Sequence, residues 1–127
     1  MALLLLDSSF LIDVLNDRNQ RAERMESMIL EGHDLAICPV NVAEIYAGMR
    51  SNEAAATEDL MRQFIYIPIR WNAARLAGEL KSAWTRRGHK LSLADTIIAA
   101  VCIIENLTLV TDNRRHFPMP ELSMYQL

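Results

Sequence analysis

Blocks of apolar and polar residues alternate along this chain and predict strands separated by helices. Residues 3–6 are an uninterrupted apolar run, typical of a strand buried on both faces. Residues 35–37, 64–69 and 107–110 predict three more strands, and the tail leaves room for a short fifth. Between the strands, apolar side chains recur at helical spacing, and the predicted helices cover residues 10–31, 41–46, 53–63, 72–84 and 93–105.

This order predicts an α/β fold, with a mainly parallel four- to five-stranded sheet and helices on both of its faces. Residues 93–105 are apolar almost all round, so we expect that helix to be central and buried. Ligand sites in such sheets lie beyond the carboxyl ends of the strands, which directs attention to the residues that follow each strand.

Composition and length narrow the class of protein. A chain of 127 residues, 51% hydrophobic, fits one domain over residues 1–127, and its net charge of −3 excludes a bulk nucleic-acid binder. The opening apolar run is broken by Asp7 too early for an export signal, and no run is long enough to span a membrane. Cys38 and Cys102 lack a paired spacing, so we expect buried free thiols and a cytoplasmic protein.

Four acidic residues stand at junctions between the predicted elements. Asp7 and Asp112 each follow a strand, while Glu44 and Asp95 occupy the last position of N-x-x-E and S-x-x-D patterns. Those patterns suit helix capping, and a carboxylate at a strand end also suits a turn. Taken singly, each acid therefore leaves capping and chemistry open.

Taken together, the four acids favour a metal site. Asp95 lies in an apolar run, where an ionised carboxylate is costly unless it is paired or binds a metal. If the four converge, their mutual repulsion is relieved by a hard divalent cation, and oxygen ligands suit Mg²⁺ or Mn²⁺. Such ions commonly act on phosphate by activating water, so a phosphodiester is the expected substrate.

In their local contexts the four acids resemble those of a PIN-domain ribonuclease, specifically a VapC-type toxin of a toxin–antitoxin pair. Four stretches carry the resemblance over residues 3–117, namely LLLLDSSFLIDVL, ICPVNVAEIYAGM, LSLADTIIAA and LVTDNRRHF. The resemblance implies a PIN-like three-layer α/β/α sandwich and an endoribonuclease dependent on Mg²⁺ or Mn²⁺. It also implies a cytoplasmic homodimer and a cognate antitoxin, which forms a hetero-oligomer with the toxin and fills a groove on it.

The resemblance assigns roles residue by residue. Asp7, Glu44 and Asp95 match the acids that hold the metal, with Glu44 acting directly or through water. The fourth acid falls on Asp112 or is replaced by its neighbour Asn113. Supporting polar roles fall on Ser9, Thr111 and Asn113.

Further candidates surround these positions. The basic residues expected to contact RNA are Arg86, Arg87, Lys90, Arg114 and Arg115. The residues expected in the antitoxin groove are Ile45, Tyr46 and Met49. The alternative function is a catalytically silent PIN-like module that binds or regulates, in which the acids only cap helices.

Overall fold

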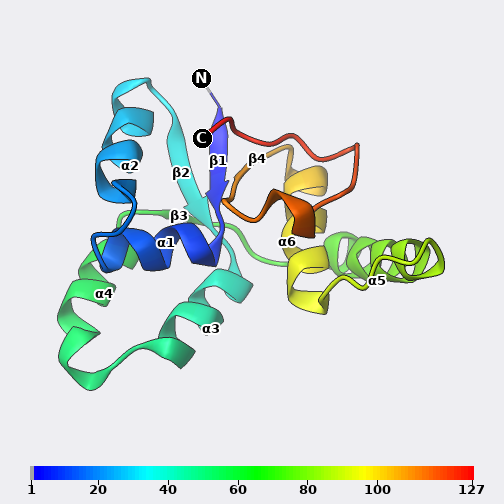
Figure 1. The fold of residues 1–127 in the computed structure, drawn as a ribbon, viewed down its shortest axis with the longest axis horizontal. Helices are drawn as coiled ribbons and strands as arrows, with labels where there is room; N and C mark the ends of the chain where they lie inside the picture. The colour runs from blue at the N-terminus through cyan, green and yellow to red at the C-terminus, as the bar shows by residue number, and fades with distance from the viewer. Residues whose placement is uncertain (1) are drawn as a thin grey trace.

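A parallel sheet of four strands forms the centre of the computed structural model, which describes residues 2–127 (Figure 1). The strands are β1 (Leu3–Leu6), β2 (Asp34–Ile37), β3 (Ile65–Tyr66) and β4 (Thr108–Val110), in the spatial order β3-β2-β1-β4. All three neighbouring pairs are parallel, and a parallel bridge joins Leu109 to Met124 in the tail. The predicted parallel sheet is therefore confirmed with four strands.

Six helices connect and cover the strands. They are α1 (Ser8–Leu15), α2 (Arg21–Leu30), α3 (Pro39–Gly48), α4 (Ala54–Met61), α5 (Trp71–Arg86) and α6 (Leu93–Glu105). Two short 3₁₀ turns, η1 (Ser51–Glu53) and η2 (Arg114–His116), lie between them. Within residues 2–127, no helix has the length and apolar character needed to cross a lipid bilayer.

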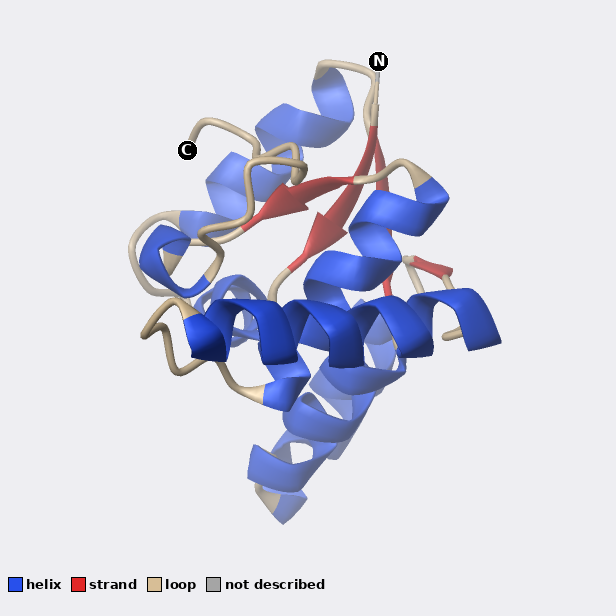
Figure 2. Cartoon of the chain, turned by 90° about the vertical axis from the view of Figure 1, so that its right-hand side faces the viewer, coloured by secondary structure: helices blue, strands red, loops and turns tan. Residues whose placement is uncertain are grey.

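The alternation of β1 side chains builds two separate cores, one on each face of the sheet. Leu5 packs with buried residues of α5 and α6, while Leu4 and Leu6 pack with those of α1, α2, α3 and α4. In Figure 2 the long α5 lies in front of the strands, which run behind it. The fold is therefore the expected three-layer α/β/α sandwich, and β1 is its most deeply buried strand.

One predicted helix is wrong. Residues 10–31 form two helices, α1 and α2, separated by a turn at residues 16–20. Asp17, Asn19 and Gln20 all have positive φ, at 52°, 54° and 54°, so the backbone leaves the right-handed helix there. The break lets α2 fold back and pack Met25 and Met28 onto the same core as α1.

The other differences concern element ends. The expected strand over residues 64–69 is reduced to Ile65–Tyr66 at the edge of the sheet, where both side chains are exposed.

Cys38 and Cys102 are buried free thiols, as predicted, and burial raises the pKa of both.

We predict that Leu4→Ala destabilises the fold by about 2–5 kcal/mol, because the side chain is fully buried and its removal leaves a cavity. Urea unfolding followed by circular dichroism measures the free energy of unfolding. Leu30→Ala is the matched control, since Leu30 is 88% exposed, and we expect a change within about 0.5 kcal/mol. Equal losses in the two variants would contradict the central position of β1.

Candidate functional site

Asp7 directly follows the central strand, and three hydrogen bonds hold its carboxylate in place. Its side chain is buried, and its backbone N–H donates to the carbonyl oxygen of Val110 at the end of β4. The carboxylate accepts from the Ser8 N–H at 2.9 Å, the Ser9 hydroxyl at 3.2 Å and the Thr111 hydroxyl at 2.7 Å. Asp7 is also the N-cap of α1, so the two roles left open for it coincide.

A serine links Glu44 to the residues around Asp7. The Ser8 hydroxyl donates to the Glu44 carboxylate at 2.6 Å and accepts from the Asn41 side-chain amide at 3.3 Å. Asn41 is fully buried, and its side-chain oxygen accepts from the Cys38 N–H at 2.8 Å. A short polar network therefore joins the start of α1 to α3, directly beyond the ends of β1 and β2 (Figure 1).

The capping interpretation of Glu44 is wrong. Helix α3 begins at Pro39 with Cys38 as its N-cap, so the residue at the third helical position is Asn41 rather than Glu44. Proline fixes φ at a helical value and needs no N–H in the first turn, which explains the earlier start. The Glu44 carboxylate lies beyond the first turn and is free of any part in closing the helix end.

Asp95 lies in the first turn of α6, where Ser92 already caps the helix by accepting the Asp95 N–H at 3.1 Å. Burial raises the pKa of the Asp95 carboxyl, and the charges of Asp7 and Glu44 raise it further. A hydrogen bond from Ser92 and the imidazole of His116, 3.4 Å away, act in the opposite direction. Asp7, Glu44 and Asp95 thus share one electrostatic environment.

Asp112 does not join these three acids in the structure. Its carboxylate binds the guanidinium of Arg21 on α2, with Nε 3.2 Å from Oδ2. Thr111 turns inward to Asp7, whereas the Asn113 N–H donates to the Thr111 hydroxyl at 3.0 Å. The predicted supporting roles of Ser9 and Thr111 are matched by direct contacts with Asp7, whereas the pairing of Asp112 with Arg21 does not favour its predicted role as a fourth acid.

The basic candidates separate into two groups. Lys90 and Arg115 line a hollow that also contains Asp95. Arg86 donates to Ser82, and Arg87 stacks over the Trp84 ring. The remaining candidate, Arg114, donates to the backbone carbonyl of Tyr125.

The residues expected in the antitoxin groove lie on two different sides of α3. Ile45 and Met49 line a hollow of about 100 Å³ between α1, α3 and α4, and Glu44 lies on its wall. Tyr46 points to another side of α3, where its hydroxyl donates to Glu58. Only two of the three candidates therefore share a surface with the acids.

Three residues of the site are not among the candidates that the sequence supplies. Ser9 was the expected polar neighbour of Asp7, but it is Ser8 that joins Glu44 to the start of α1. Asn41 entered only through the N-x-x-E pattern, and His116, which lies against Asp95, was not a candidate. The pair of serines after Asp7 was the one available signal, because adjacent residues at a helix start reach different partners.

The donor set suits a hard divalent cation. Three carboxylates supply oxygen ligands only, and burial, together with the charges of Asp7 and Glu44, disfavours the Asp95 anion and raises its pKa. Among residues 2–127, however, no group of three or more His, Cys, Asp and Glu side chains is arranged so that it could hold a metal ion.

Comparison with known proteins is consistent with this geometry. A family model described as PIN domain matches residues 4–121. Ribonuclease VapC10 of Mycobacterium tuberculosis is 34% identical over 119 residues, which cover 94% of this chain and 89% of that protein. Ribonuclease VapC19 of the same organism is 29% identical over 119 residues, covering 93% of this chain and 95% of its own.

Solved structures share the fold. A chain of VapBC2 from Rickettsia felis, bound to a DNA fragment from the promoter, superposes with a TM-score of 0.84 and 22% identity over 97% of both chains. A toxin–antitoxin complex from Klebsiella pneumoniae gives a TM-score of 0.79 and 24% identity over 98% of this chain and 99% of that chain.

We predict that Thr111→Val lowers the free energy of unfolding by about 1–3 kcal/mol, because the buried Asp7 carboxylate loses a hydrogen-bond donor. Thr108→Val, on the same strand, is the control and should change stability by less than about 0.5 kcal/mol. Denaturant unfolding of both variants is the measurement. If Thr111→Val were as stable as the control, Thr111 would not hold Asp7.

Proposed function

This chain belongs to the PIN-domain family, within its VapC group, and we propose that it is an endoribonuclease and the toxin of a toxin–antitoxin pair. The observation that carries the proposal is the placing of Asp7, Glu44 and Asp95 at one end of the sheet, in one electrostatic environment. Ribonuclease VapC10, the 34% identical relative, supports the reaction class. A silent PIN-like module, the alternative, would not require three acids held together at a cost.

We propose that Mg²⁺ or Mn²⁺ is the cofactor, held by Asp7 and Asp95 directly and by Glu44 directly or through water. A divalent cation there would neutralise charge on a phosphate oxygen and lower the pKa of an attacking water. In this proposal Asp112 serves to anchor Arg21 and α2 rather than to bind the ion.

The chain's own residues organise the acids. Thr111 and Ser9 fix the Asp7 carboxylate from two sides, and Ser8 fixes Glu44 against the start of α1. Fixed carboxylates lose little further freedom when a cation and a phosphate arrive, so the site is preorganised for the reaction. Cleavage in this way is expected to leave a 5′-phosphate and a 3′-hydroxyl.

The partners follow from the same comparison. We propose that a cognate antitoxin binds the hollow lined by Ile45 and Met49, which lies directly beside Glu44. A side chain inserted there would hinder RNA from reaching the acids, and the solved toxin–antitoxin complex from Klebsiella pneumoniae supports such a partner. We also propose a cytoplasmic homodimer, since the exposed Ile65 and Tyr66 are apolar side chains of the kind that a contact between copies covers.

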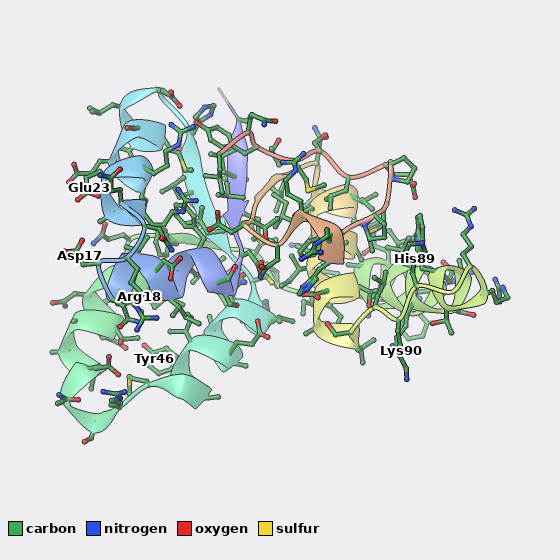
Figure 3. All side chains as sticks on the ribbon, in the orientation of Figure 1. Asp17, Arg18, Glu23, Tyr46, His89 and Lys90 are labelled. Carbon is green, nitrogen blue, oxygen red and sulfur yellow. The ribbon has the colours of Figure 1, made fainter. Side chains whose placement is uncertain are left out.

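We predict that Asp7→Asn, Glu44→Gln and Asp95→Asn each lower the rate of RNA cleavage at least about 100-fold. The measurement is the initial rate on single-stranded RNA with Mn²⁺ present. Asp17→Asn is the matched control, because Asp17 is exposed at the far end of α1 and asparagine tolerates its positive φ (Figure 3). Equal rates for wild type and Asp7→Asn would refute the proposal.

We predict further that EDTA abolishes cleavage and that an excess of Mg²⁺ or Mn²⁺ restores it. The reason is that three carboxylates repel a phosphodiester unless a cation neutralises them. Gel analysis of RNA before and after chelation makes the test, and undiminished cleavage in EDTA would exclude a metal-dependent reaction.

A further inference from the structure

A hollow of about 270 Å³ opens beside Asp95, on the side of the acidic site away from Glu44 and α1. Two segments distant in sequence form it. His89, Lys90 and Ser92 come from the connection between α5 and α6, which runs beside the projecting α5 (Figure 3), while Arg115 and His116 come from η2.

Two exposed basic side chains line the hollow. They are Lys90 and Arg115, and across residues 2–127 neither makes a salt bridge with an acidic side chain. Three basic residues nearby make other contacts, namely Arg86, Arg87 and Arg114. Beside Asp95, the hollow therefore offers a ligand two positive charges.

Two imidazole rings help to shape the hollow. The His89 ring packs edge-on against Trp84, with centroids 5.1 Å apart, and His116 lies against Asp95. Both imidazoles can donate hydrogen bonds to an anion without bringing a further negative charge. The hollow thus offers an anion both positive charge and hydrogen-bond donors within reach of the acids.

The opposite side of the acidic site has the reverse character. The hollow beside Glu44 is lined by two acids, Glu44 and Glu53, together with apolar and neutral polar residues, and no basic residue is among its lining. A polyanion crossing the three acids is repelled on that side and attracted on the Asp95 side. The two hollows therefore make the acidic site electrostatically asymmetric, and the Asp95 side is the one that favours RNA.

We propose that the hollow lined by Lys90, Arg115 and His116 binds a backbone phosphate of the RNA strand adjacent to the bond that is cut. This inference rests on the proposed ribonuclease function and deepens it. Arg115 pairs with the phosphate through its planar guanidinium, and Lys90 adds a second positive charge on a flexible stem. Since a phosphate contact carries no base information, the subsite positions RNA without selecting its sequence.

The test compares Arg115→Gln with Arg70→Gln, a matched loss of an exposed arginine charge outside the hollow. With single-stranded RNA and Mn²⁺, Arg115→Gln should raise KM about 10-fold and leave kcat within about twofold. Arg70→Gln should keep both values near those of wild type, and Arg115→Lys should recover part of the loss. Thermal unfolding should be unchanged, because Arg115 is exposed.

A second readout counts the phosphate contact directly. Fluorescence anisotropy with the same RNA in EDTA gives binding as a function of salt, and Arg115→Gln should reduce the slope of log K against log salt by about 0.7. If wild type cleaves RNA but Arg115→Gln matches Arg70→Gln in KM and slope, the subsite is wrong and the proposed function stands. A fall in kcat with KM unchanged also overturns the subsite. If wild type neither binds nor cleaves RNA, the proposed function fails and the subsite with it.

Discussion

The site depends on one constraint, namely that a carboxylate buried at the end of a fully buried strand must have partners. An unpaired Asp7 would cost several kcal/mol in this environment. Three donors meet the requirement, and one of them, Thr111, directly follows the neighbouring strand β4, 104 residues along the chain. The contact that stabilises Asp7 therefore also fixes the ends of β1 and β4 against each other.

From Asp7 the arrangement extends outward through neighbouring residues. Ser9 holds Asp7, while Ser8 holds Glu44 and is itself held by Asn41. These bonds join the first turns of α1 and α3, which lie beyond the carboxyl ends of the parallel strands β1 and β2. Asp95 arrives from α6 on the other face of the sheet, so both layers of helices contribute to the acidic site.

Most of the fold was predictable because apolar runs and helical spacing are local signals. The strand at residues 3–6 and the Ser92 cap agree with the structure residue for residue. The break at residues 16–20 was missed because apolar spacing continues across it, although an Asp and two Asn residues there favour turns. Local patterns also carry no information on Asp112, whose orientation is set by Arg21, 91 residues away. For the same reason, the sequence could not show that Ser8 binds Glu44 while Ser9 binds Asp7.

In the arrangement that we propose, Asp7, Glu44 and Asp95 form one cation site and Asp112 lies outside it. Calorimetric titration of Mn²⁺ into wild type, Asp7→Asn, Asp95→Asn and Asp112→Asn tests this arrangement. We expect Mn²⁺ to bind to wild type and to Asp112→Asn, and not to the other two variants. Absence of binding to wild type, or loss in Asp112→Asn equal to that in Asp7→Asn, would contradict it.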